Sequence, residues 1–408
     1  MSLQATQVPA PLFTPEFVQD PYPTYRMHLE GPPIQSPVKP PPHAIAFTYD
    51  ACVRLFRDPR LSAAKRLQAM QMLPGQGRND LPYLYEHMGR WLLFRDAPDH
   101  TRLRKLMNAG FSPMATERLR ATTETAVEEL LDAMADAAQP DLVRDLAYPL
   151  PVRVISRLLG VPRELEQQCV NLSDAIAVWW GDPHRTVEGG HAAQSAARTL
   201  TEMFGTIMRE RNSGGGDDLL ELLLGISRED GGMSEEELQA QCVLLLFAGH
   251  ETTRSLIGNA MLTLLRNPEA CADVRASDEA IRPAIEEVLR YESPVQGAVR
   301  VATEDVEYDG HRIGKGSALL LLTAAAQRDP RRFENPDRFD IHRQHLRHIA
   351  FGGDAHVCLG ATLARLEGQI AVQRALRRFP RMRLLDPTPA WSPVFGFRGL
   401  TRLNVAIP

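Results

Sequence analysis

One thiol stands in a glycine-rich loop, FGGDAHVCLG, which runs from Phe351 to Gly360 and leads into a helix-like segment. A thiolate at the start of a helix is stabilised by backbone N–H groups and by the helix dipole, and both effects lower its pKa. The Cys358 thiol is therefore placed to act as a nucleophile or as a metal ligand. The alternative for an isolated cysteine is a buried side chain that packs as a small hydrophobe.

The neighbours of Cys358 limit which metal it could bind. A structural zinc site needs further ligands, and beyond His356 no Cys or His follows at a zinc-finger spacing. A haem iron needs only one strong axial ligand from the protein. The residues that would let the backbone approach a flat ring, or shield the sulfur from water, are Phe351, Gly352, Gly353 and Gly360.

Polar side chains interrupt the apolar segment 244–265. They lie in the run Ala248-Gly249-His250-Glu251-Thr252-Thr253. Carboxyl and hydroxyl groups inside an apolar helix are costly unless they are hydrogen-bonded or used. The Thr252 hydroxyl can compete for the carbonyl of Ala248, and Gly249 removes a side chain, so a small ligand could fit beside a metal here. The alternative is a helix whose Glu and Thr simply face solvent.

The cysteine loop resembles the haem-binding loop of cytochromes P450, Phe-Gly-x-Gly-x-His/Arg-x-Cys-x-Gly. The matching residues are Phe351, Gly352, His356, Cys358 and Gly360. Asp354 stands where the family usually has its second glycine. Because Asp tolerates left-handed backbone better than most residues, we expect the loop to form nonetheless.

Segment 248–253 resembles the oxygen-binding helix of the same family. The resemblance implies that Thr252 hydrogen-bonds iron-bound dioxygen, that Glu251 supplies protons to it, and that Ala248 lies against the cofactor. His100 and Arg104, at i and i+4 in DAPDHTRLRK, resemble the family's pair of haem-propionate ligands. By the same resemblance, Arg300 and His356 would complete the propionate contacts.

A third motif resembles the structural ion-pair triad of the family. Glu287 and Arg290 form its Glu-x-x-Arg pair, and Arg338 in Pro-Asp-Arg-Phe stands where a second arginine is expected. The resemblance implies that these three residues hold the haem-loop region in place and take no part in catalysis.

Helical patterns dominate the chain, with a minor strand region at 299–322 and no βαβ alternation. The resemblance extends from the proline-rich N-terminal segment (about 1–43) to the C-terminus. It implies a mainly α fold with a minor β region, the P450 triangular helical prism with small β-sheets. We therefore expect one haem domain over residues 1–408.

Composition excludes several classes of function. The net charge is −5, and charges of both signs are spread along the chain, which argues against a nucleic-acid surface. Five widely spaced cysteines with no CxxC pair favour a reducing compartment over a disulfide framework. The N-terminus lacks a signal-peptide pattern, and no apolar run is long enough to span a bilayer. We expect a monomer in the cytoplasm, without membrane association.

The resemblance implies haem b with a Cys358 thiolate ligand. It also implies a monooxygenase of secondary metabolism that inserts one oxygen atom of O2 into a small apolar organic substrate, by hydroxylation or epoxidation. Electrons would come from NAD(P)H through a ferredoxin or flavodoxin and its reductase, since no flavin domain is recognisable. Alternatives are C–C coupling, dehydration or H2O2-driven peroxygenation on the same fold. A remote alternative is a thiol hydrolase with Cys358 as nucleophile and His356 as base.

Two further surfaces follow from the resemblance. The substrate pocket would be lined by 66–90, 170–185, Leu245, Ala248, Val295 to Ala298 and the region of Phe395–Phe397. Met70, Met72, Tyr83, Trp179 and Trp180 would make it apolar, and no cation stands out in this lining. A basic patch for an acidic redox partner would comprise Arg102, Lys105, Arg343 and Arg347.

Overall fold

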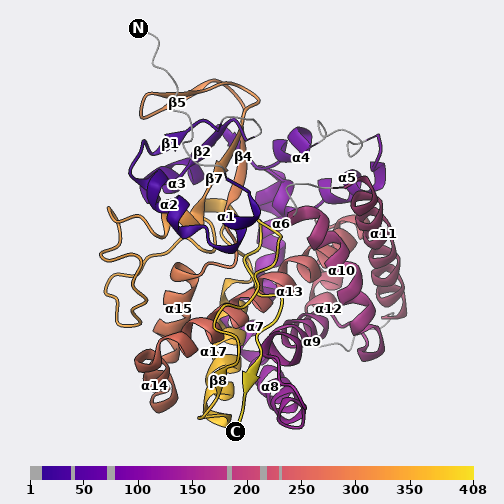
Figure 1. Cartoon of the computed structure of the whole chain (residues 1–408). Coiled ribbons are helices and arrows are strands. Elements are labelled where there is room, and N and C mark those ends of the chain that lie inside the picture. The colour runs from indigo at the N-terminus through magenta and orange to yellow at the C-terminus, as the bar shows by residue number, and fades with distance from the viewer. Residues whose placement is uncertain (1–11, 38–41, 71–78, 182–185, 212–217, 229–231) are drawn as a thin grey trace.

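The computed structural model describes residues 12–37, 42–70, 79–181, 186–211, 218–228 and 232–408. Helices make up most of this structure. Most strands gather at one side, near the N-terminal elements, whereas β8 lies at the other end, near the C-terminus (Figure 1). The predicted mainly α fold with a minor β region is confirmed. Among the described residues, no helix combines the length and apolar character needed to cross a membrane.

The α-helices are α1 (Pro15–Gln19), α2 (Tyr22–Leu29), α3 (Tyr49–Phe56), α4 (Lys65–Met70), α5 (Pro82–Gly89), α6 (Asp99–Asn108), α7 (Pro113–Arg118), α8 (Arg120–Ala135), α9 (Pro149–Leu158), α10 (Glu166–Gly181), α11 (Val187–Glu210), α12 (Leu219–Ser227), α13 (Glu235–Arg266), α14 (Pro268–Ala276), α15 (Ile281–Tyr291), α16 (Thr323–Ala326) and α17 (Ala361–Arg378). Shorter helical turns are η1 (Leu92–Phe94), η2 (Ala109–Phe111), η3 (Val143–Ala147), η4 (Arg163–Leu165) and η5 (Asp354–His356).

The strands are β1 (Ile34–Gln35), β2 (Ala44–Ala46), β3 (Leu61–Ser62), β4 (Ala298–Ala302), β5 (Val306–Tyr308), β6 (His311–Ile313), β7 (Ala318–Leu321), β8 (Arg383–Leu384) and β9 (Val405–Ala406). The largest sheet has the order β1-β2-β7-β4-β3, in which only β2 and β7 are parallel. In β4, Arg300 pairs in register with Leu319 of β7. The strands predicted within 299–322 are confirmed. They include a turn at Asp309-Gly310, where both residues have positive φ.

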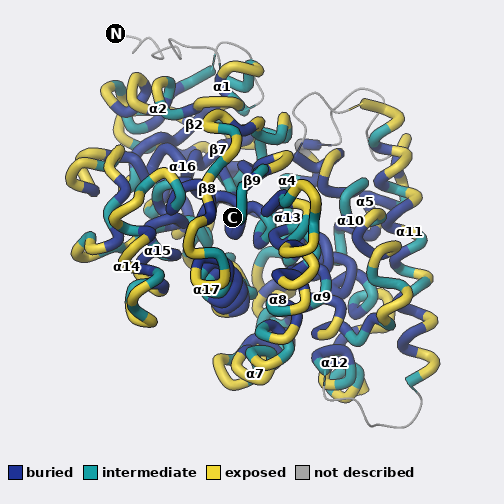
Figure 2. The backbone as a smooth tube through the Cα atoms, turned by 60° about the horizontal axis from the view of Figure 1, so that its bottom comes forward, coloured by how far each residue is buried: buried dark blue, intermediate teal, exposed yellow. Residues whose placement is uncertain are grey.

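The long helix α13 lies at the centre of the helical part (Figure 1). It starts with a capping box, in which the Ser234 hydroxyl accepts from the Glu237 N–H and the Glu237 carboxylate accepts from the Ser234 N–H. Most of its 32 residues are buried, so helices surround it rather than solvent. In Figure 2 the buried residues fill the interior, and exposed residues follow outer helices such as α7 and α11. A helix in this position can carry side chains into the interior.

The cysteine loop adopts the tight conformation that its glycines indicate. Gly352 has φ 75°, and Asp354 has φ 54°, so both lie in the left-handed region. The Cys358 N–H donates to the Phe351 carbonyl at 2.8 Å, which closes the loop on itself. Gly360 then caps α17. The expectation that an aspartate can replace the family's second glycine is confirmed.

The structural ion-pair triad differs from the prediction in one member. Arg290 binds Glu287 through two hydrogen bonds of 2.8 and 2.7 Å, and both side chains are fully buried. The third member is Arg343, whose Nε lies 3.2 Å from Glu287 Oε1. The Arg338 side chain is exposed, and only its backbone carbonyl takes part, accepting from Arg290 and Arg343. The assignment of Arg338 to the triad was therefore wrong, because the chain turns between the two arginines and brings the second one inward.

Replacing Arg343 with alanine should destabilise the protein by about 3 kcal/mol, because it removes one partner from a buried ionic cluster. Arg338→Ala keeps the backbone carbonyl and should change the free energy of unfolding by no more than about 0.5 kcal/mol. Urea unfolding followed by far-ultraviolet circular dichroism measures both variants. Equal effects of the two substitutions would contradict the assignment of Arg343.

Candidate cofactor-binding and active site

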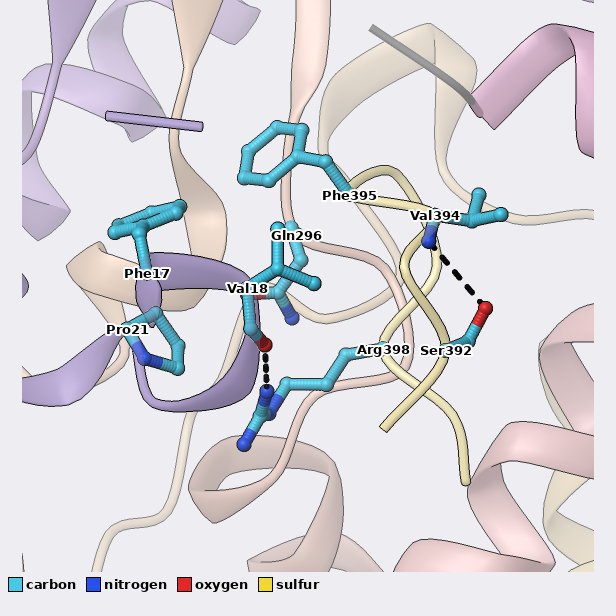
Figure 3. Close-up of a pocket in the computed structure, with 8 residues that line it drawn as sticks. All are labelled: Phe17, Val18, Pro21, Gln296, Ser392, Val394, Phe395 and Arg398. Carbon is cyan, nitrogen blue, oxygen red and sulfur yellow. Dashed lines mark hydrogen bonds between the residues drawn. The ribbon is translucent and has the colours of Figure 1, made fainter. Parts of the chain in front are cut away.

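A cavity of about 1080 Å³ lies between α13, the cysteine loop and the strand region. It receives side chains from segments far apart in the sequence, from Leu12 near the N-terminus to Phe397 near the C-terminus. A second pocket, bounded by the α1 region and the C-terminal loop (Figure 3), measures about 10 Å³, which leaves room for about one water molecule. The large cavity is therefore the candidate site.

Cys358 exposes its surface to this cavity. Burial raises the pKa of the thiol, and the opposing effects of the Gly360 N–H and of the Arg104 and Arg365 charges are smaller. The helix start therefore lowers the pKa of the Cys358 thiol as predicted, but burial raises that pKa by more. A thiolate in this place needs a further cation, which a metal would supply.

Four cationic or potentially cationic side chains from three separate segments meet at the cavity. The rings of His100 and His356 are 4.1 Å apart between centroids, and burial together with nearby positive charge lowers the pKa of His356 to about 3. Arg104 donates to the Val357 carbonyl at 2.6 Å, and Arg300, which is 7% exposed, donates to the Val299 carbonyl at 3.0 Å.

This cluster has the character of an anion site. Among the described residues, the buried Nε2 of His100 has no hydrogen-bond partner, and no carboxylate hydrogen-bonds the Arg300 guanidinium. A buried cation is costly unless an anion meets it. The structure thus brings the four predicted residues together, in an arrangement that suits the carboxylates of a bound group.

Thr252 and Ala248 of α13 line the same cavity. The Thr252 hydroxyl donates to the Ala248 carbonyl at 2.7 Å, as the sequence predicted. Ala248 is exposed in the middle of an otherwise buried stretch because it faces the cavity. Glu251 points elsewhere: it is 8% exposed and pairs with Arg254 at 2.9 Å, and burial raises its pKa to about 7.

Comparison with known proteins agrees with this geometry. The family model described as Cytochrome P450 matches residues 75–381. The chain belongs to the cytochrome P450 family. The family implies haem held by a cysteine thiolate, and Cys358 is the only described cysteine that lines the cavity.

Two relatives cover most of this P450. It is 38% identical over 326 residues to the biotin biosynthesis cytochrome P450 of Bacillus subtilis (strain 168), covering 80% of this chain and 81% of that protein. It is 37% identical over 401 residues to the cytochrome P450 monooxygenase PikC of Streptomyces venezuelae, covering 96% and 92%. Its relatives include named monooxygenases and hydroxylases, so this P450 is an oxidoreductase.

Solved structures confirm the P450 fold. The structure of P450BioI in complex with an acyl carrier protein ligated to hexadec-9Z-enoic acid matches with a TM-score of 0.87 and 34% identity, covering 96% of this chain and 99% of that one. The structure of epothilone D-bound cytochrome P450epoK matches with a TM-score of 0.88 and 33% identity, covering 97% and 98%.

The distal lining of this P450 differs in detail from the prediction. Met70, Trp180, Leu245, Ala248, Val295 and Phe397 line the cavity as expected. Tyr83 and Trp179 are not among the lining residues, and Met72 falls outside the described residues. Arg66 on α4 belongs to the predicted lining segment 66–90, but as a cation it contradicts the expectation that no cation stands out there. Its guanidinium lies 4.2 Å from the Trp180 ring centroid.

Glu367 on α17 is a second lining residue that was missed. It is 3% exposed, its Oε2 has no hydrogen-bond partner among the described residues, and burial raises its pKa to about 8. The helical pattern of the sequence already indicates that Glu367 is buried. Glu367 lies on the same helix face as Leu363, Leu366 and Ile370, where an acid is out of place.

Glu367→Gln should stabilise the P450, and the gain should grow with pH. The unfolded carboxyl ionises near its usual value and the folded one near 8, so the wild type loses stability as pH rises from about 4.5 to about 8. The variant lacks this loss and should be more stable by on the order of 2 kcal/mol at pH 8. Unfolding at pH 5 and pH 8 measures the difference, and a gain that is independent of pH would contradict the buried neutral acid.

Proposed function

We propose that this P450 is a haem-thiolate monooxygenase that inserts one oxygen atom of O2 into an apolar organic substrate, by hydroxylation or epoxidation. The observation that carries the proposal is the meeting of Cys358, Thr252, two arginines and two histidines around one cavity. When bound, haem b would supply the chemistry of dioxygen activation.

The cavity lining supplies a contact for each part of the cofactor. The Cys358 thiolate would be the axial ligand of the iron, because its sulfur faces the cavity. The groups that would bind the propionates are His100, Arg104, Arg300 and His356. The residues that would pack against the ring are Ala248, Phe351, Gly352 and Gly360.

Glu251 and Thr252 would supply protons to the cavity. A pKa near 7 lets Glu251 both accept and release a proton at neutral pH, which suits a general acid. Thr252 is the next residue and lines the cavity, and its hydroxyl can exchange its bond with the Ala248 carbonyl for one with a ligand. The pair would pass protons from the buried carboxyl to the cavity.

The substrate would be a largely apolar molecule of secondary metabolism. The distal lining is made mostly of aliphatic and aromatic side chains. Relatives named for polyketide and epothilone chemistry, and neighbours bound to myristic acid or to epothilone D, support long-chain or macrocyclic substrates. The lining cation Arg66 would suit a polar end on such a molecule.

Electrons would come from NAD(P)H through a separate ferredoxin or flavodoxin with its reductase. The basic patch predicted for docking is reduced, because Arg102 binds Glu237 and Arg343 binds Glu287. Lys105 and Arg347 are exposed and would remain available to an acidic partner. We further propose that residues 1–408 act as one haem domain, as a monomer in the cytoplasm.

Thr252→Ala should divert electrons from product to peroxide and lower the product formed per NAD(P)H by roughly tenfold. Thr252→Ser keeps the hydroxyl and should restore coupling. The assay uses a surrogate ferredoxin and reductase, with whichever of myristic acid and epothilone D shifts the spin state of the haem. Unchanged coupling in Thr252→Ala would contradict the role of this hydroxyl.

The reduced, CO-bound wild type should show the red-shifted Soret band of thiolate ligation. Cys358→His should lose it, and Cys271→Ala, which alters a buried cysteine outside the cavity lining, should keep it. Retention of the band in Cys358→His would overturn the ligand assignment. Loss of cofactor binding without loss of the fold in that variant would agree with it.

A further inference from the structure

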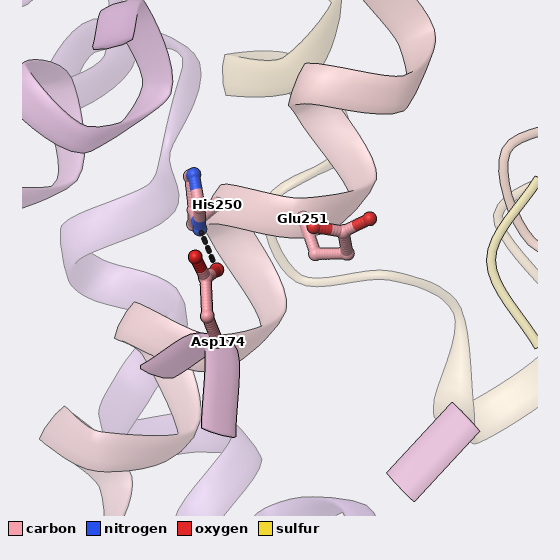
Figure 4. Close-up of side chains that lie close together, drawn as sticks. All are labelled: Asp174, His250 and Glu251. Carbon is pink, nitrogen blue, oxygen red and sulfur yellow. Dashed lines mark ion pairs between the residues drawn. The ribbon is translucent and has the colours of Figure 1, made fainter. Parts of the chain in front are cut away.

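A cluster of titratable groups lies on the side of α13 next to α10. One ligand-type atom from each of Asp174, His250 and Glu251 falls within 4.8 Å of the others. Figure 4 shows Asp174 reaching from α10 toward His250, with Glu251 beside it on α13. Two carboxylate oxygens at such a distance can be joined by a single water molecule.

The members of this cluster differ in their access to solvent. The side chain of Asp174 is 33% exposed, that of Glu251 is 10% exposed and that of His250 is 1% exposed. Asp174 is therefore the member that can exchange protons with bulk water. Thr252 follows Glu251 and lines the cavity, so the cluster spans the distance between solvent and the candidate active site.

Neighbouring residues hold the two acids in place. The Tyr148 hydroxyl donates to Asp174 Oδ2 at 2.7 Å, and His250 Nδ1 lies 3.4 Å from Asp174 Oδ1. Arg254 donates to Glu251 at 2.9 Å and to the Leu400 carbonyl at 3.4 Å, and it lies 5.4 Å from the Tyr148 ring centroid. The positive charge of Arg254 beside Glu251 disfavours a metal ion in this cluster.

The protonation of the cluster suits transfer between two acids. Burial raises the pKa of Asp174 and that of Glu251, and the nearby charge of Asp174 raises the latter further. Burial lowers the pKa of His250 to about 3, so this ring is neutral at neutral pH. Tyr148 remains a phenol because its pKa is raised.

We propose that Asp174 is the solvent-side relay that reprotonates Glu251. Asp174 takes one proton from water and passes it, directly or through one bridging water, to the Glu251 carboxylate. Each carboxylate gains and then loses one proton, so the charge of the pair returns to its starting value once Glu251 has passed the proton on toward the cavity. Asp174 acts through Glu251 and does not touch the substrate, and the proposal rests on the proton-supplying role proposed for Glu251.

An infrared pH titration of the resting holoenzyme tests the coupling without turnover. The carboxyl stretch of Glu251, assigned by its loss in Glu251→Gln, should titrate near pH 7 in the wild type. Asp174→Asn should lower that midpoint, because it removes the negative charge that raises the pKa of Glu251. Glu129→Gln, which breaks an ion pair with Arg153 elsewhere, should leave it unchanged. An unchanged midpoint in Asp174→Asn would overturn the proposal.

Turnover gives the second test, with myristic acid or epothilone D as the probe and a surrogate ferredoxin and reductase. Asp174→Asn should slow product formation by roughly tenfold and increase the solvent isotope effect, and Asp174→Glu should restore both. The hydrogen bond from Tyr148 lowers the pKa of Asp174. Tyr148→Phe removes that bond and keeps the acid, so the pKa of Asp174 should rise and the pH profile should shift to higher pH.

The outcomes separate this proposal from the one on which it rests. Normal turnover and coupling in Glu251→Gln would refute the role of Glu251, whatever Asp174 does. Impaired turnover in Glu251→Gln with a normal rate, isotope effect and pH profile in Asp174→Asn would refute the relay alone. Failure of Asp174→Glu to restore the rate would assign Asp174 a packing role and would also overturn the relay.

Discussion

A negative charge inside an apolar cavity is stable only where a cation meets it, and the architecture of this P450 follows from that constraint. Burial raises the pKa of the Cys358 thiol, so the thiolate form depends on a metal cation beside it. At the same cavity, the cations Arg104 and Arg300 and the ring nitrogens of two histidines can meet anions. Cys358 and Arg104 come from segments more than two hundred residues apart in the sequence. The fold has to bring both kinds of charge to one place before the site exists.

Helix α13 carries polar groups into the interior and satisfies two of them through bonds within the helix. Glu251 is bound by Arg254 of its own helix, and Thr252 is satisfied by the Ala248 carbonyl. Both bonds are local to the helix, so forming them needs no distant partner. Glu367 on α17 shows the other outcome, since its buried carboxyl remains protonated up to about pH 8.

The segment ahead of the cysteine loop is held largely by the buried Arg290, and Arg343 adds bonds to three carbonyls of the same segment. Besides Glu287, Arg290 binds the carbonyls of Gln327, Pro336 and Arg338. These acceptors lie in irregular chain between α16 and the cysteine loop, where few backbone groups bond to each other. One fully buried guanidinium with its fixed fork of donors replaces the regular hydrogen bonds that this segment lacks.

Local patterns in the sequence determined the helical class, the strands around Asp309-Gly310, the cysteine loop and the Thr252–Ala248 bond, because each depends on residues close together in the chain. Tertiary structure alone decided the rest. Arg343 displaced Arg338 from the triad because a turn between them reverses which side chain points inward. The contact of Arg66 with the Trp180 ring and the approach of Asp174 to Glu251 both depend on how separate helices pack against each other. Spacing along a chain specifies neighbours within a turn or a helix, whereas contacts between distant segments depend on how those elements pack.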